Sequence, residues 1–333
     1  MPKVGSQVIL CDLPVRFDTY KGCTHDCSYC FARKRQDIGL VALGETASDL
    51  RGFIAGRRGL DMGWIDWKIP IHWGGLSDPF QPAEKQQRAS LQALVVFAET
   101  KYPVVISTKG RLCVAKEYLE LFRQCDLAIQ VSMLDSGYDA KEPGAPTFEE
   151  RLSFRPVLAA HTRRVVVRLQ PYYLGTWREV VRWFGHYADA GVHGVTVEGF
   201  KSQKALAGGV KVGGDYCYEV TRLRKELVEI RRAAHEHGLA FYSAENRLRD
   251  LGDDPCCCGV ADLWEVNKAN LNHMDADGVI PYRESMKRRG TGACFRGVSQ
   301  SVDVSAAARM MTFEEGMEIC RKTRGILEVM GRA

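Results

Sequence analysis

The sequence predicts an α/β protein folded as a partial (β/α)6-type barrel, with a seventh candidate strand. Short apolar runs rich in β-branched residues alternate with polar or glycine punctuation and then with amphipathic, helix-like stretches. Strand-then-helix repetition of this kind favours a parallel sheet with right-handed crossovers. No glycine-rich dinucleotide fingerprint opens the first helix, which favours a barrel over an open doubly wound sheet.

The expected strands follow one another along the chain at intervals that each leave room for a helix. The first is an extended run at 14–20, and the others lie at 69–73, 103–107, 127–133, 164–170, 193–199 and 239–246. Periodic stretches at 84–99, 115–125, 176–191 and 219–238 predict the intervening helices.

The strand–helix rhythm stops near Leu251. We therefore expect a barrel core over residues 1–250 and a C-terminal extension over 251–333 that packs on the barrel. A last helix is predicted from Thr312, because Thr312 and Glu315 form a capping-box pair.

Composition limits the class of protein. A chain of 333 residues with 45% hydrophobic residues can bury a large core. No apolar run is long enough to span a bilayer, and the start lacks a long apolar signal region, so the sequence predicts a soluble, cytoplasmic protein, or one in the host cytoplasm if phage-encoded. The net charge of +5 is compatible with a phosphate-bearing partner but does not require one.

Three cysteines near the N-terminus carry the clearest chemical signal. Cys23, Cys27 and Cys30 have C-x3-C-x2-C spacing, and the chain has twelve cysteines in all. In a reducing compartment, clustered cysteines indicate a metal site or catalysis more often than disulfides. Three thiolates can hold three corners of one iron–sulfur cube and leave the fourth iron open to a small molecule. A zinc knuckle that uses His25, or three unrelated core cysteines, are the alternatives.

Polar side chains also stand where each expected strand ends. The catalytic groups of a barrel lie at the carboxyl ends of its strands, so these residues predict an active-site rim, with ordinary helix capping as the alternative. The residues are Ser77, Asp78, Ser107, Lys109, Gln130, Ser132, Arg168, Gln170, Glu198, Glu245 and Asn246.

Three blocks of sequence together resemble a known family. They are the cysteine loop with Tyr29 before its last cysteine, HWGGLSDPFQP at 72–82, and VVISTKG at 104–110 followed by QVSM. Over roughly residues 14–250 the chain resembles the spore photoproduct lyase-like branch of the radical S-adenosylmethionine (SAM) superfamily. The resemblance implies a radical SAM barrel and an enzyme of lyase or isomerase type.

The resemblance also implies cofactors and the residues that hold them. Cys23, Cys27 and Cys30 would bind a [4Fe–4S] cluster whose open iron chelates SAM, and an electron donor such as flavodoxin or ferredoxin would reduce it. Gly74 and Gly75 would let the SAM amino group approach the backbone. The side chains expected around SAM are Tyr29, beside the adenine, and Ser77, Asp78, Lys109, Ser132, Gln170 and Glu198.

The implied substrate is a thymine-derived base in DNA. The family's lyase donates hydrogen from a cysteine placed just before the serine–aspartate pair, where this chain has Gly75 or Leu76. Without that cysteine, the resemblance does not extend to dimer repair itself. This chain is also similar to phage members of the branch that take part in thymidine hypermodification of DNA.

A hydrogen donor, where one is needed, would then come from elsewhere in the chain. The candidates are Cys258 and Cys294, with Cys256 and Cys257 beside them, on a loop folding back over the barrel mouth. The same cysteines could instead hold an auxiliary cluster or be buried. Tyr172, Tyr173 and Trp177 offer a stacking platform for a flipped base.

Two other functions stay open at this point. One is a radical SAM enzyme that acts on a peptide or small metabolite and carries an auxiliary cluster. The other is a non-enzymatic, metal-binding nucleic-acid module.

Overall fold

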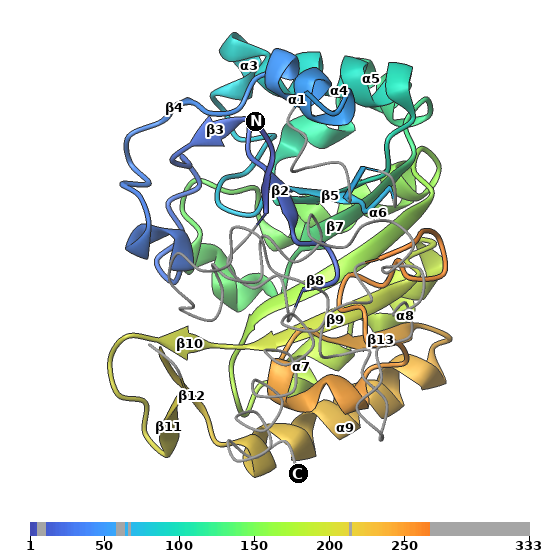
Figure 1. Ribbon diagram of the computed structural model, residues 1–333. Coiled ribbons are helices and arrows are strands. Elements are labelled where there is room, and N and C mark those ends of the chain that lie inside the picture. The colour runs from blue at the N-terminus through green and yellow to red at the C-terminus, as the bar shows by residue number, and fades with distance from the viewer. Residues whose placement is uncertain (5–10, 58–63, 66–67, 213–214, 267–333) are drawn as a thin grey trace, which may run out of the picture.

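A computed structural model describes residues 1–4, 11–57, 64–65, 68–212 and 215–266 of the chain (Figure 1). Cys294 and the helix expected from Thr312 lie outside these ranges, and so does most of the C-terminal extension. Within the described ranges no helix is long and apolar enough to cross a membrane.

One eight-stranded sheet forms the centre of the fold. Its strand order is β1–β2–β5–β6–β7–β8–β9–β13, and every neighbouring pair is parallel except β1 with β2. The strands are β1 (Lys3–Val4), β2 (Val15–Phe17), β5 (Ile71–Trp73), β6 (Val104–Thr108), β7 (Leu127–Ser132), β8 (Arg164–Tyr172), β9 (Gly194–Gly199) and β13 (Ala240–Ser243). All seven expected strands are present and parallel, so the predicted partial barrel is confirmed, with the seventh candidate as its last strand. The antiparallel β1 was not predicted.

Helices cover the outer face of this sheet. Figure 1 shows the strands in the middle, with α1, α3, α4 and α5 along one flank and α7, α8 and α9 along the other. Their bounds are α1 (Ala47–Ile54), α3 (Glu84–Gln87), α4 (Ala89–Thr100), α5 (Lys116–Phe122), α6 (Phe148–Ala159), α7 (Trp177–Val181), α8 (Phe184–Asp189) and α9 (Val220–Glu236). The 3-10 helices are η1 (Phe31–Lys34), η3 (Arg111–Val114), η4 (Ser136–Lys141) and η5 (Asn246–Leu251).

Alternation along each strand separates the two faces of the sheet. In β6, Val104 and Ile106 join the large core shared with the helices, whereas Val105 belongs to a second, smaller core. Side chains alternate between the faces of a strand, so Ser107 points the same way as Val105, into the barrel. In β6, one set of alternating side chains therefore packs in the core under the helices, and the other set faces the barrel interior.

Two small sheets extend the barrel at its carboxyl end. One pairs β3 (Tyr20–Lys21) with β4 (Ala42–Leu43), on either side of the cysteine loop. The other, in the order β10–β12–β11, comprises β10 (Lys201–Ser202), β12 (Asp215–Tyr218) and β11 (Gly209–Val212). An ion pair between Lys34 of η1 and Asp215 of β12 connects the two regions. Neither small sheet was predicted.

After β13 the chain turns and runs back toward the amino ends of the strands. Phe241 of β13 exchanges hydrogen bonds with Asp253, whose backbone N–H donates to the Phe241 carbonyl at 2.8 Å. Further on, Arg164, the first residue of β8, donates to the Gly259 carbonyl at 2.6 Å and pairs with Asp262. Residues 252–266 therefore close the amino end of the barrel.

This return path places Cys256 and Cys258 at the amino end of the barrel, opposite the mouth that the carboxyl ends of the strands form. Cys256 and Cys258 are buried with Leu13, which precedes β2, and with Val105 and Ala128, near the amino ends of β6 and β7. The expectation of a loop folding back over the mouth is therefore wrong for Cys256 and Cys258. Hydrogen donation by Cys258 at the mouth does not fit this position, because the thiol lies among apolar side chains at the other end of the sheet.

One buried carboxylate fixes the start of the cysteine loop to the helical layer. Glu84 is fully buried and accepts from the hydroxyls of Tyr20 and Tyr118 and from the backbone N–H groups of Ser90 and Leu91. The same side chain thus caps α4 and holds β3, the strand that leads into the loop.

We expect Glu84→Ala to lower the free energy of unfolding by about 3 kcal/mol or more, because it leaves buried hydroxyls and N–H groups without acceptors. Urea unfolding measures this. Glu120→Ala, at a carboxylate that is 60% exposed, is the matched control and should change the free energy by less than about 0.5 kcal/mol. Equal losses in the two variants would contradict this role for Glu84.

Candidate active site

The three predicted ligand cysteines lie on a tight loop, residues 22–30, between β3 and η1; we call it the cluster loop. Gly22 has φ +74°, and a Cβ there would stand 2.4 Å from the Leu40 carbonyl oxygen, so only glycine fits. Burial raises the pKa of the Cys23 thiol to about 12 and that of Cys27 to about 11, although Lys109 opposes the second shift. Both sulfurs are therefore neutral thiols that would ionise on binding a cation.

A segment after β7, residues 135–147, presses on the cluster loop; we call it the clasp. The Ser28 N–H donates to the Lys141 carbonyl at 2.9 Å, and the Gly144 N–H donates to the His25 carbonyl at 3.0 Å. A Cβ at Gly144 would lie 2.0 Å from the Thr24 carbonyl oxygen. Any side chain at position 144 would therefore push the loop and the clasp apart.

His25 joins the clasp to the strand ends. Its Nδ1 lies 2.9 Å from the Gly144 carbonyl oxygen, and its Nε2 lies 3.2 Å from a carboxylate oxygen of Asp78. Nδ1 thus has a hydrogen-bond acceptor, whereas Nε2 lies beside Asp78 without a hydrogen bond. Among the described residues, no three ligating side chains converge on one metal ion. A zinc knuckle would need its donors about 2.0–2.3 Å from a single ion, whereas a cube places each thiolate on a different iron.

Asp78 lies at the centre of the hydrogen bonds that hold the mouth. One oxygen accepts from the Thr108 hydroxyl at 2.7 Å and the Phe80 N–H at 2.8 Å, and the other accepts from the Lys109 N–H at 2.6 Å. Burial opposes its ionisation, but His25 and these donors outweigh burial, and the pKa of Asp78 is lowered. Asp78 therefore holds the ends of β5 and β6 and the cluster loop together.

The glycine-rich end of β5 has two different glycines. Gly74 has φ +91°, and a Cβ there would lie 2.4 Å from the Ser107 carbonyl oxygen, so the close approach of β6 excludes any other residue. At Gly75 a Cβ would make ordinary van der Waals contact with Arg16, at 3.7 Å, so a small side chain would fit there. The Ser77 hydroxyl donates to the Tyr20 carbonyl at 2.8 Å and so ties β5 to β3.

Lys109 gathers two more of the predicted residues around it. Its ammonium donates to the Ser132 hydroxyl at 2.9 Å and lies 5.7 Å from the centre of the Tyr29 ring. Glu142 of the clasp lies 3.7 Å from the ammonium and accepts from the Tyr29 hydroxyl. Tyr29, Lys109 and Ser132, which lie far apart in sequence, therefore meet at one place beside the cluster loop.

Sequence reasoning missed Glu142 and its partner Arg151. Both are buried, and their nearest charged atoms are 2.5 Å apart. Burial opposes the ionisation of Glu142, yet Lys109 and Arg151 outweigh it and lower its pKa. Glu142 lies in a turn after η4, where no periodicity or spacing distinguishes it from a solvated turn residue.

Polar side chains from five adjacent strands form a continuous hydrogen-bonded belt inside the barrel. His72 lies 2.8 Å from the Ser107 hydroxyl, which donates to Gln130 at 3.1 Å. Arg168 donates to Gln130 at 3.2 Å and to Glu198 at 3.3 Å. The remaining links of the belt are Gln170 and Lys201, which both donate to Glu198. The predicted rim residues Gln170 and Glu198 thus belong to the belt rather than to the group around Lys109.

The expected aromatic platform is not available for stacking as predicted. Tyr172 is fully buried and donates to Glu226. The Tyr173 ring stacks on Phe200, with centroids 4.8 Å apart, and the Lys141 ammonium lies 4.3 Å from its centre. Trp177 packs against the large core and against Arg178. The three rings are thus already occupied by contacts within the protein.

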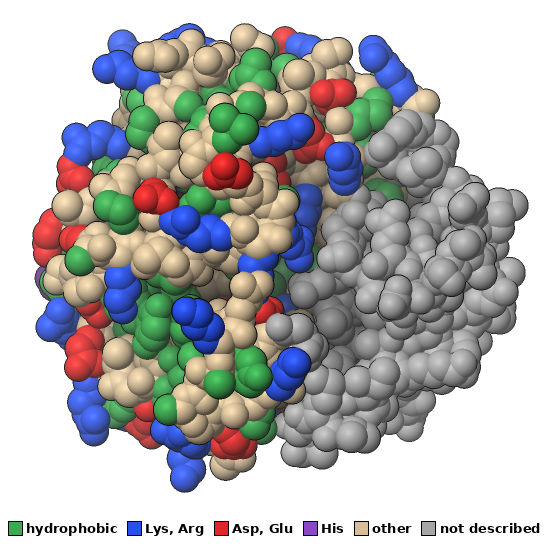
Figure 2. Space-filling view, turned by 90° about the vertical axis from the view of Figure 1, so that its left-hand side faces the viewer, with side chains coloured by type: hydrophobic (Ala, Val, Ile, Leu, Met, Phe, Trp, Pro, Cys, Tyr) green, Lys and Arg blue, Asp and Glu red, His purple; other side chains and the backbone are tan. Residues whose placement is uncertain are grey.

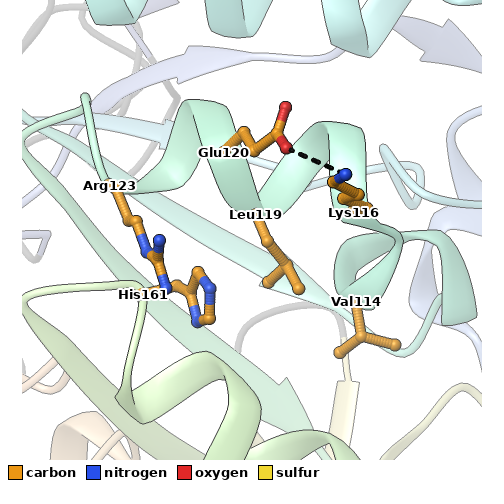
Figure 3. Close-up of a pocket in the computed structure, with 6 residues that line it drawn as sticks. All are labelled: Val114, Lys116, Leu119, Glu120, Arg123 and His161. Carbon is orange, nitrogen blue, oxygen red and sulfur yellow. Dashed lines mark ion pairs between the residues drawn. The ribbon is translucent and has the colours of Figure 1, made fainter.

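A separate hollow of about 320 Å³ lies on the helical outer face (Figure 3). It is lined by Val114, Lys116, Leu119, Glu120, Arg123 and His161. Figure 3 shows Arg123 and His161 side by side and Lys116 paired with Glu120. None of these residues belongs to the mouth, so we assign no catalytic role to this hollow.

Comparison with known proteins places this geometry in a known fold. No family model matches the chain. Uncharacterised proteins of Mycobacterium bovis and Mycobacterium tuberculosis are 26% identical over 240 residues, which is 68% of this chain and 69% of theirs. A spore photoproduct lyase cysteine mutant superposes with a TM-score of 0.59 at 16% identity, over 70% of this chain and 77% of that one. The chain has the fold of spore photoproduct lyase.

Other solved structures agree with this assignment. A spore photoproduct lyase double mutant with bound SAM and dinucleoside spore photoproduct gives a TM-score of 0.56 at 14% identity, over 69% of this chain and 76% of that one. Streptococcus suis SuiB bound to SAM gives 0.51 at 13% identity, over 70% of this chain and 51% of that one. The spore photoproduct lyase-like resemblance expected from the sequence is confirmed at the level of the fold.

The buried pair of Glu142 and Arg151 generates a test of this site. We expect Glu142→Gln to cost about 3 kcal/mol of unfolding free energy, because it leaves the Arg151 charge buried without its partner. The double variant Glu142→Gln/Arg151→Met should recover most of this loss. Urea unfolding at pH 7 measures both, with the exposed Glu149→Gln as control.

The pH dependence should follow the direction of the Glu142 pKa. Because this pKa is lowered on folding, the pair contributes stability above the ordinary carboxyl pKa, and that contribution is lost as pH falls through the lowered folded-state value. Glu142→Gln should therefore be less sensitive to acid than the wild type. Additive losses in the double variant would contradict the coupling of the pair.

Proposed function

We propose that this protein is a radical SAM enzyme that acts on a thymine-derived base in DNA. The observation that carries the proposal is the cluster loop itself: three cysteines on a spore photoproduct lyase fold, beside a lysine at the carboxyl ends of the strands. The spore photoproduct lyase neighbours, which are described with bound SAM and a dinucleoside lesion, support the choice of cofactor and of substrate class.

The residues of the mouth fit a [4Fe–4S] cluster. Cys23, Cys27 and Cys30 are soft sulfur donors, and the iron cations would offset the burial that keeps the first two protonated. His25 donates from Nδ1 to the Gly144 carbonyl and pairs with Asp78 at Nε2, so in this proposal it is not a fourth ligand. One iron would therefore lack a protein ligand, as SAM chelation requires.

The group around Lys109 fits SAM. The ammonium of Lys109 suits the SAM carboxylate, and Gly75, which has no side chain, would leave its backbone accessible to the SAM amino group. Glu142 and Ser132 hold the Lys109 side chain in place, and Asp78 holds its backbone. When bound, the cluster supplies one electron to SAM and yields a 5′-deoxyadenosyl radical that removes hydrogen from the substrate.

The substrate then belongs on the other side of the mouth, against the belt. A base in duplex DNA must leave the stack to enter the barrel, at a cost of a few kcal/mol. Gly75 and Leu76 stand where the lyase family has its donor cysteine, and Cys258 lies at the opposite end of the barrel. We therefore favour hypermodification or isomerisation over dimer repair, with flavodoxin or ferredoxin as the electron donor.

Anaerobic reconstitution with iron and sulfide tests the proposal. With SAM and dithionite the protein should release 5′-deoxyadenosine, and thymine-containing DNA should increase the yield and be altered. If the reconstituted protein forms no 5′-deoxyadenosine, the assignment to radical SAM enzymes is contradicted. Formation that no DNA stimulates would contradict the substrate and favour a peptide or small metabolite.

Each of the three alanine variants Cys23→Ala, Cys27→Ala and Cys30→Ala should lose the brown chromophore and SAM cleavage, because each thiolate holds one iron. Iron analysis and visible absorbance measure the loss. Cys125→Ala, at a cysteine that packs against the large core, is the control and should keep its iron. Retained iron–sulfur absorbance in all three loop variants would reject the cluster assignment.

Lys109→Ala should keep the iron content and weaken SAM binding by about 1.5–3 kcal/mol, because it removes a charge-assisted hydrogen bond. Equilibrium binding of SAM to the reconstituted protein measures this. Lys116→Ala, at a lysine that is 91% exposed, should bind SAM as the wild type does. Wild-type affinity in Lys109→Ala would show that SAM binds elsewhere.

A further inference from the structure

A second group of charges lies at the carboxyl ends of β8, β9 and β13, across the mouth from Lys109. The cations are Arg168, Lys201 and Arg247, and the carboxylates facing them are Glu198 and Glu245. Lys34 and Asp215 pair η1 with β12, and so connect this side of the mouth to the cluster loop. The group therefore belongs to the same mouth as the cluster loop.

Glu198 accepts hydrogen bonds from three neighbouring side chains. One oxygen accepts from Lys201 at 2.5 Å, and the other accepts from Gln170 at 2.6 Å and from Arg168 at 3.3 Å. Burial opposes its ionisation, but Lys201 and Arg168 outweigh burial and lower its pKa. Three donors thus engage Glu198, and no hydrogen bond joins it to Arg247.

Arg247 keeps an unmet hydrogen-bond donor. Its side chain is 2% exposed, and Nε donates to Glu245 at 3.1 Å. Its Nη2 is buried and has no hydrogen-bond partner in the described structure. A buried charged donor without an acceptor costs about 1–3 kcal/mol or more, and a ligand oxygen at this atom would remove that cost.

Three cations face two carboxylates in this group. The adjacent thiol of Cys217 and phenol of Tyr218 are neutral because burial raises their pKa values, whereas Arg168 also faces Cys257, whose pKa is lowered to about 6 by Cys258, Arg249 and Arg168. Arg249 is directed elsewhere, to Asn246, the Pro255 carbonyl and Cys257. Asp215 is engaged by Lys34. The buried guanidinium of Arg247, with one donor unpaired, therefore has room for an anionic acceptor.

We propose that Arg247, with Lys201 and Arg168 beside it, binds a phosphodiester oxygen of the substrate. The planar guanidinium matches phosphate geometry, and a phosphate here would lie across the mouth from the SAM side. Figure 2 views the side of the cluster loop and β10, and on its described part Lys and Arg are interspersed with Asp and Glu. Because charges of both signs are mixed on this side, recognition of a phosphate would depend on a local contact at the mouth. This inference rests on the proposed DNA substrate.

Binding of two thymidine dinucleotides to the reconstituted protein tests the inference. One carries the natural phosphodiester and the other a neutral methylphosphonate linkage. The wild type should bind the phosphodiester about tenfold or more tightly than the neutral analogue. Arg247→Met should abolish this preference and Arg247→Lys should keep part of it, while the exposed Arg182→Met should behave as the wild type.

A wild type that binds both dinucleotides equally, or an Arg247→Met that keeps the preference, would overturn the inference. A second measurement distinguishes a wrong phosphate site from a wrong choice of DNA as the substrate. It compares thermal unfolding in sodium phosphate with thermal unfolding in sodium chloride of equal ionic strength. Phosphate should raise the Tm of the wild type but not that of Arg247→Met, even when neither dinucleotide binds. Equal Tm shifts in the two proteins, or greater protection by acetate than by phosphate, would reject the phosphate site.

Discussion

The buried carboxylate of Asp78 is the constraint on which the rest of the mouth depends. It accepts hydrogen bonds from the end of β6 and lies against His25 of the cluster loop, which the clasp holds from the other side. Three segments distant in sequence are thereby fixed around one charge. A loop of three cysteines needs such a frame, because its thiols must keep their places before any cluster is bound.

Two groups of polar side chains lie on opposite sides of the barrel mouth. On the β5–β7 side, Lys109, Ser132 and Glu142 form the compact group at which we propose that SAM binds. On the β8–β13 side, Glu198 and Arg247 belong to the charged group at which we propose that a substrate phosphate binds. The belt joins these sides through Gln130 and holds both in fixed register. Residues 252–266 cover the amino end, and both proposed ligands are placed at the carboxyl end.

Local sequence patterns determined much of this arrangement, and tertiary contacts determined the rest. The parallel strands were predictable because their apolar runs are β-branched and evenly separated. Lys109 and Ser132 were predictable because strand ends meet at one edge of a parallel sheet. Glu142 was not, since a turn carries no periodicity. The position of Cys258 was also missed, because the return of the chain along β13 depends on Asp253 contacting Phe241 rather than on any local signal.

The open iron is the central claim, and electron paramagnetic resonance tests it most directly. The dithionite-reduced protein should show the signal of one [4Fe–4S]⁺ cluster, and adding SAM should change its g-values, because SAM would coordinate the iron that no cysteine holds. A signal that SAM leaves unchanged would mean that a fourth protein ligand closes the cluster. That result would contradict the account.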